Sequence, residues 1–193
     1  MSEDKGMEMK THGESYFQNV LFDSHNEFDG YTCELYLPKD IVPLNSNQKV
    51  ALAAWIAEAN QGAITGSVML FMRGIYLGRE IGDIDILVED TSPDDIVLPP
   101  LCERIEGHDE EGYKVLARAY FFGNKIEFIH VDEIRADPHS FRLDGKSKIM
   151  KVARVEDLVA AKEFYLYNCT NEEYKEKTRR DLEVIDNHFS TSI

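Results

Sequence analysis

Two carboxylates, Asp83 and Asp85, alternate with isoleucines within the sequence GDIDILVE at residues 82–89. The alternation predicts a strand, and side chains two positions apart on a strand share one face, with Cα atoms about 6.6–7 Å apart. At 4 Å, two such charges repel by roughly 4 kcal/mol at an effective dielectric of 20. A cation between them removes the repulsion, and oxygen-only ligands favour Mg²⁺ or Mn²⁺. The plainer interpretation places both acids in surface turns.

Gly66 and Ser67 lie between a short expected strand, residues 63–65, and an expected helix over residues 68–76. Glycine lets the backbone approach a ligand closely, and a serine at a helix N-terminus offers its hydroxyl and N–H to an anion. A phosphate cradle beside a metal site indicates a nucleoside triphosphate. The alternative is an ordinary turn with a serine cap.

Glu127 is the only acid inside the apolar run at residues 125–129, and an unpaired buried charge is costly. It is therefore our candidate for a third carboxylate, with Asp132 at the end of the same strand as the alternative. The flanking run at residues 113–122 predicts a hairpin partner for the strand 125–131.

Gly123 and Asn124 separate these two runs and are typical of a tight hairpin turn. A turn at these two residues would place Tyr120 opposite Glu127, on the same face of the sheet.

The remaining segments complete an α+β pattern, a mixed β-sheet flanked by helices with further C-terminal helices. We expect helices over residues 47–60, 155–167 and 174–188, and loops over residues 91–100 and 135–148. This divides the chain into an acidic N-terminal extension packed on the domain (1–46), a core (47–150) and a C-terminal helical part (151–193). One or two strands are expected within residues 1–45.

The charge balance narrows the partners. The 193 residues include 36 acidic and 21 basic side chains, a formal net charge of −15, which argues against binding of long nucleic acid. No signal peptide and no membrane-spanning segment is expected. Three scattered cysteines, at positions 33, 102 and 169, fit a reducing cytoplasm and not a zinc or disulfide framework.

The candidate residues follow one another in a fixed order: Gly66-Ser67, then Arg79 and the DID sequence of residues 83–85, then an apolar strand with one acid. This order resembles the nucleotidyltransferase superfamily that shares its fold with DNA polymerase β. The 15 residues between Ser67 and Asp83 are similar to the spacing in stand-alone bacterial nucleotidyltransferases of the abortive-infection type. Two downstream segments of those proteins, of the forms edLxxxK and basic-Asp, have counterparts at residues 156–162 and 180–182.

The resemblance implies transfer of a nucleoside monophosphate from an NTP to an acceptor by a two-metal mechanism. It assigns two Mg²⁺ or Mn²⁺ ions to Asp83, Asp85 and Glu127, and the nucleotide to Gly66, Ser67, Arg79 and Lys162. The acceptor, a small molecule, a protein or an RNA end, stays open. From the residues alone, Lys162 and the Arg180-Asp181 pair could equally be solvated helix charges, and Arg79 could neutralise Asp83 or Glu80.

The sequence also departs from the family pattern. The run Val68–Arg73 after the glycine-serine bend is bulky, and the third acid is a glutamate instead of an aspartate. The alternative is therefore a catalytically weak or inactive nucleotide-binding module of the same fold, in a regulatory or toxin–antitoxin setting. A purely structural domain would leave the aspartates in water, away from Ser67.

Overall fold

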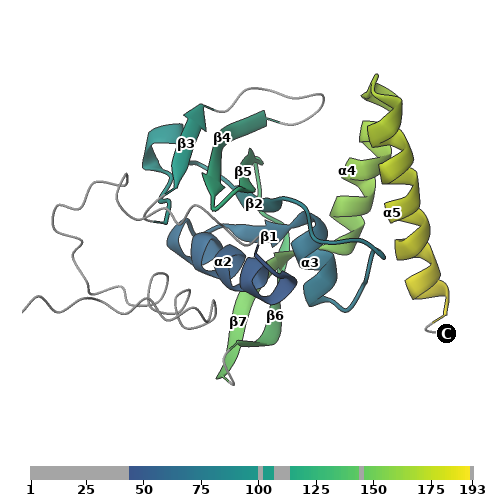
Figure 1. Cartoon of the computed structure of the whole chain (residues 1–193), viewed down its shortest axis with the longest axis horizontal. Coiled ribbons are helices and arrows are strands. Elements are labelled where there is room, and N and C mark those ends of the chain that lie inside the picture. The colour runs from purple at the N-terminus through teal and green to yellow at the C-terminus, as the bar shows by residue number, and fades with distance from the viewer. Residues whose placement is uncertain (1–43, 100–101, 107–113, 144–145, 192–193) are drawn as a thin grey trace, which may run out of the picture. The chain divides into compact units, whose positions relative to one another are not determined.

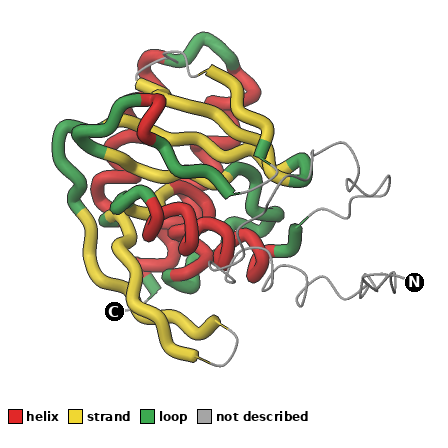
Figure 2. The backbone as a smooth tube through the Cα atoms, turned by 90° about the vertical axis from the view of Figure 1, so that its left-hand side faces the viewer, coloured by secondary structure: helices red, strands yellow, loops and turns green. Residues whose placement is uncertain are grey.

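A mixed sheet of seven strands, in the order β3-β4-β5-β2-β1-β7-β6, organises the chain (Figures 1 and 2). The computed structural model describes residues 44–99, 102–106, 114–143 and 146–191. The strands are β1 Ala63–Thr65, β2 Ile84–Val88, β3 Glu103–Glu106, β4 Lys114–Phe121, β5 Asn124–His130, β6 Ala136–Leu143 and β7 Lys146–Ala153. Neighbours β2 and β5 run parallel, as do β1 and β7, and the other neighbours are antiparallel.

Four α-helices accompany the sheet: α2 Ser46–Ala59, α3 Gly66–Met72, α4 Val155–Asn168 and α5 Glu172–Ser190. Helices α2 and α3 pack against the central strands, whereas α4 and α5 lie side by side (Figure 1). A short 3₁₀ turn, η2 Pro93–Asp95, interrupts the expected loop at residues 91–100. The predicted α+β class, a mixed sheet with flanking helices, is confirmed.

Helix α2 begins one residue before the expected 47–60, because Asn45 and Gln48 form a capping box. The Asn45 side chain accepts from the Gln48 backbone N–H, and the Gln48 side chain accepts from the Asn45 N–H, both at 2.9 Å. Satisfying two otherwise free backbone donors stabilises the first turn. The buried face of α2 then packs on the sheet through small and branched residues such as Leu52 and Ile56.

The core fixes which way β2 faces. Ile84 and Ile86 of β2 are fully buried, and so are Ile126 and Phe128 at the partner positions of β5. Each such side chain stabilises the fold by about 1.5–3 kcal/mol. Because side chains alternate across a strand, this burial directs the odd-numbered residues of β2 to the opposite face of the sheet.

The hairpin between β4 and β5 differs in register from the prediction. The turn residues are Phe122 and Gly123, both at positive φ, as a tight hairpin turn with matching twist requires. Asn124 instead starts β5 and donates its side-chain amide to the carbonyl oxygens of the turn. Arg118, and not Tyr120, therefore lies opposite Glu127. The shift is by two positions, so the same face of the sheet is kept.

The expected loop at residues 135–148 is wrong, because β6 and β7 form an antiparallel pair there. The polar side chains of β6 and β7 led to the prediction of a loop. Such side chains are tolerated in these strands because much of the hairpin extends past β1, which pairs with β7 only at Ile64 and Val152. Pro138 is accommodated because β6 is an edge strand. The Asp144-Gly145 dipeptide between the strands was the available hairpin signal.

Helix α3 begins two residues earlier and ends four residues earlier than the expected 68–76. It ends in a Schellman motif, in which the Ile75 N–H donates to the Leu70 carbonyl and the Gly74 N–H donates to the Phe71 carbonyl. These two bonds satisfy the last carbonyls and turn the chain away from the helix axis.

The strands expected within residues 1–45, and Cys33, lie outside the described residues apart from 44 and 45. Cys102 and Cys169 are free thiols. No helix in the described part of the chain is long and apolar enough to cross a membrane.

Candidate functional site

A cleft of about 470 Å³ lies between one face of the sheet and the helices α4 and α5. Its lining includes all seven residues that the sequence singled out for metal or nucleotide: Gly66, Ser67, Arg79, Asp83, Asp85, Glu127 and Lys162. Asp132, the alternative third carboxylate, is exposed after β5 and is not among the lining residues. Residues up to 116 positions apart in sequence, from Thr65 to Asp181, meet in this one cleft.

The three carboxylates come from adjacent strands. Asp85 is the Cα partner of Glu127 on β5 and of Thr65 on β1, so it occupies the centre of the face that lines the cleft. Asp83 precedes β2 by one residue and also lines the cleft. Ile84 and Ile86, which alternate with the two aspartates, are buried in the core, which confirms the predicted alternation.

Asp85 lies directly against the backbone of Gly66, the residue after β1. Gly66 has φ +64°, and a Cβ atom there would overlap the Asp85 carboxylate. Burial, and then the neighbouring charges of Glu127 and Asp83, raise the pKa of Asp85 to about 7. The side chain of Asp85 forms no hydrogen bond or ion pair with another described residue, so its oxygens are available to a ligand.

Two basic residues that the sequence interpretation missed hold the other carboxylates. The Lys125 Nζ lies 2.8 Å from Asp83 Oδ2 and 3.2 Å from Glu127 Oε1. Arg118 Nε donates to the same Glu127 Oε1 at 2.7 Å. Partial burial by itself would lower the pKa of Lys125, but the hydrogen bond to Asp83 and the charge of Glu127 outweigh it and raise that pKa. Lys125 is two positions before Glu127, which was the signal that they share a face.

Arg79 and Lys162 converge on Asp181 of α5. Arg79 Nη2 lies 2.9 Å and 3.1 Å from the two Asp181 oxygens, and Lys162 Nζ lies 2.9 Å from Oδ2. The Asp181 side chain is only 3% exposed. Burial alone would raise the pKa of Asp181, but the hydrogen bond from Arg79 and the charge of Lys162 hold it below its usual value.

The ion pairs of Asp181 with Arg79 and Lys162 answer two questions that the sequence left open. Asp181 is the acid paired with Arg79, which in addition donates to the Glu80 carbonyl oxygen and forms no ion pair with Asp83. Lys162 is not a solvated helix charge, because its side chain is 18% exposed and ion-paired within the cleft.

Lys49 of α2 positions the segment that leads into the acidic pair. Its side chain is buried, and the ammonium group donates to the carbonyl oxygens of Ile81 and Gly82, the two residues before Asp83. The available signal was a lysine on an otherwise apolar helix face. Lys49 thereby ties helix α2 to the backbone that presents Asp83.

The donor set of Asp83 and Asp85 fits a hard divalent cation. Both ligands are oxygen-only carboxylates, and the charge crowding that raises the pKa of Asp85 is relieved by a cation. Within the described ranges, no group of three histidine, cysteine or acidic side chains has an arrangement suited to a metal ion. Glu127 is in the cleft, but its Oε1 is held by Arg118 and Lys125.

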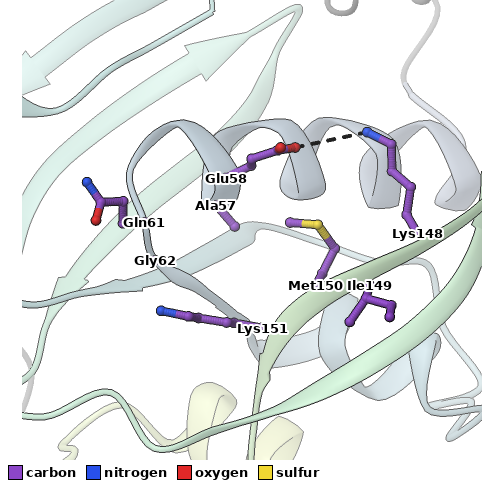
Figure 3. A pocket seen from close by; sticks show the side chains of 8 residues that line it. All are labelled: Ala57, Glu58, Gln61, Gly62, Lys148, Ile149, Met150 and Lys151. Carbon is purple, nitrogen blue, oxygen red and sulfur yellow. Dashed lines mark ion pairs between the residues drawn. The ribbon is translucent and has the colours of Figure 1, made fainter.

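A second hollow of about 420 Å³ lies between the end of α2 and β7 (Figure 3). Glu58 and Lys148 point toward each other across it at 4.0 Å, with Met150 between α2 and the strand. Its lining has a single acid and neither a carboxylate pair nor a glycine-serine bend. The chemically equipped site is therefore the cleft beside α4 and α5.

Comparisons of the chain with profiles of known protein families, with curated protein sequences and with solved structures found no match. A function assigned to this chain therefore depends on its own residues. What supports it is the convergence, in one cleft, of an acidic pair, a glycine-serine bend and two cations held by one buried aspartate.

Proposed function

We propose that the chain is a metal-dependent nucleotidyltransferase, with the nucleotidyltransferase fold, that moves a nucleoside monophosphate from an NTP to an acceptor. The observation that carries this proposal is that Asp83, Asp85, Ser67 and Lys162, which the sequence assigned separately to metal and phosphate, line the same cleft. A cleft of about 470 Å³ is also in the size range of small-molecule sites.

The anionic part of the nucleotide would bind on the side of Ser67, Arg79 and Lys162. Because α3 has only seven residues, its contribution comes from the Ser67 hydroxyl and nearby backbone N–H groups more than from the helix as a whole. Arg79 and Lys162 supply two positive charges, and their side chains are partly buried, with 31% and 18% of the surface exposed. Charge-assisted hydrogen bonds from such groups are the stronger kind.

Asp181 has a positioning role in this arrangement. By accepting from Arg79 and Lys162 together, it fixes two flexible cationic side chains in one geometry before any ligand arrives. Holding them in place lowers the entropy lost when a triphosphate binds.

Asp83 and Asp85 would hold the divalent cation, which when bound neutralises phosphate charge and lowers the pKa of the acceptor hydroxyl. Gly66 lets the backbone lie against Asp85, so the acidic pair and the phosphate side are in direct contact. In the transfer, the acceptor oxygen forms a bond to the α-phosphorus, the bond to the bridging oxygen breaks, pyrophosphate leaves and the hydroxyl proton passes to water.

The test measures binding and transfer with the same set of variants. Calorimetry with ATP, CTP, GTP and UTP in Mg²⁺ identifies the nucleotide, and α-labelled NTP with small-molecule, protein and RNA fractions identifies the acceptor class. Asp85→Asn should abolish transfer, whereas Asp132→Asn, the same change at an exposed site outside the cleft lining, should not. Binding no tighter than millimolar for every nucleotide, together with no effect of Asp85→Asn, would refute the proposal.

A second candidate, nucleotide binding without turnover, is favoured by one observation. Glu127, the third carboxylate of the predicted site, is already engaged by Arg118 and Lys125. A binding module would show metal-dependent nucleotide binding in calorimetry but no label in any acceptor fraction. Incorporation of label that depends on Asp85 would exclude it.

A further inference from the structure

Lys125 lies between the carboxylates of Asp83 and Glu127, where negative charge is concentrated. Its ammonium group is within hydrogen-bond distance of two different carboxylates, Asp83 at 2.8 Å and Glu127 at 3.2 Å. The side chain is 28% exposed, so most of its surface is covered by neighbouring residues. A lysine in that position bridges the two acids as a bound cation would.

Glu127 has little capacity left for a further cation. Its side chain is 12% exposed, and Oε1 accepts from Arg118 at 2.7 Å in addition to Lys125. A magnesium or manganese ion binds carboxylate oxygen at about 2.0–2.2 Å and takes several ligands at once. An ion bridging Asp83 and Glu127 would therefore need the space that the Lys125 ammonium group occupies.

Asp85 differs from both neighbours, because its side chain has no hydrogen-bond or ion-pair partner in the described part of the chain. Arg118 and Lys125 are ion-paired with Asp83 and Glu127, which leaves the negative charge of Asp85 without an ion pair among the described residues. One divalent ion more than balances it, whereas a second would leave the cluster strongly positive.

We propose that the Lys125 ammonium group is a built-in cation of this cluster, so that the cluster binds one divalent ion, through Asp83 and Asp85, and not two. The inference rests on the proposed function for the premise that Asp83 and Asp85 bind a metal. It assigns Glu127 a positioning role: together with Asp83, it holds Lys125 over the face of β2 and β5.

The experiment counts Mn²⁺ ions per chain by electron paramagnetic resonance of the free ion, with Mn²⁺ as the probe and the full chain throughout. We expect one ion in the wild type and two in Lys125→Met. Lys125→Arg, which keeps the charge, should return the count to one. Lys114→Met is the matched control, because Lys114 is exposed, lines the cleft and forms no ion pair with a described residue, and its count should stay at one.

Each result bears on a different claim. Two ions in the wild type overturn the inference about Lys125 and leave the transferase proposal standing. One ion in both the wild type and folded Lys125→Met also overturns it, because the lysine then does not limit the count. No Mn²⁺ bound by any variant, with or without a non-hydrolysable NTP, contradicts the metal premise and the proposed function together. Circular dichroism confirms folding, and Lys125→Gln replaces the methionine variant if that one does not fold.

Discussion

The Asp85 carboxylate fills the space that a side chain at Gly66 would need. Gly66 follows the short strand β1 and starts α3 with φ +64°, a conformation that residues with a Cβ atom rarely adopt. The two requirements, positive φ and no side chain, are independent, and both select glycine. This contact joins the acidic pair to the bend that we assign to phosphate.

Gly66→Ala should lower the free energy of unfolding by about 2–5 kcal/mol, because backbone strain and the overlap with Asp85 add together. Gly74→Ala separates the two causes, since Gly74 also has positive φ (+78°) but nothing lies within 4 Å of a Cβ atom there. Gly74→Ala should lower the free energy of unfolding by only about 1–2 kcal/mol. Urea unfolding of both variants is the measurement, and equal losses would show that Asp85 does not crowd residue 66.

Asp85→Asn should separate stability from function. At pH 8 the Asp85 carboxylate, with a pKa of about 7, is charged, partly buried and next to two other acids. Removing its charge should stabilise the metal-free protein by roughly 1–3 kcal/mol, the discounted value of a shift of this size. Mn²⁺ affinity should fall by about 10–100-fold or more, because loss of a residue that only supports a metal ligand typically lowers the affinity by that factor. Urea unfolding in EDTA and Mn²⁺ titration test the two halves, and a destabilised variant contradicts the first.

Lys49→Met should destabilise the fold and weaken nucleotide transfer, although Lys49 does not line the cleft. The methionine keeps the apolar stem but leaves the carbonyl oxygens of Ile81 and Gly82 without their donor, a cost of about 1–3 kcal/mol. The control is Lys148→Met, which removes a long ion pair to Glu58 at the surface and should change stability by less than about 1 kcal/mol. Chemical denaturation compares them, and similar losses would show that the Lys49 bonds are not structural.

Much of this site could be predicted from local sequence patterns. The strand around Asp83 and Asp85 followed from alternation with isoleucine, and β1 at residues 63–65 was predicted to the residue. Both depend on neighbours in sequence and on burial of one face, which is the information that periodicity carries.

The missing parts of the site depend on pairing between distant segments. Arg118 reaches Glu127 only because the turn falls at Phe122 and Gly123, and a turn one residue later along the chain changes every partner in the hairpin. Asp181 meets Arg79 across 102 positions of sequence. No local pattern encodes such a distance, so the residues alone show Asp181 only as one charge on a charged helix, and only the family resemblance singled out residues 180–182. The β6–β7 hairpin was missed for a different reason, since strands with little burial lack the apolar alternation that identifies them.

Asp181→Asn should show the clearest pH dependence. Because its pKa is lowered in the folded state, the charged carboxylate contributes stability above its ordinary pKa, and that contribution is lost as the pH falls toward the folded-state pKa. At pH 7 the substitution leaves Arg79 and Lys162 without their shared partner and should cost roughly 3 kcal/mol, the lower end for a broken buried pair. The stability difference between wild type and variant should shrink steadily below about pH 4. Urea unfolding from pH 7 down to pH 2.5 measures it, with the exposed Asp132→Asn as the flat control. A difference that stays constant in acid would mean that the Asp181 charge is not what holds the two cations in place.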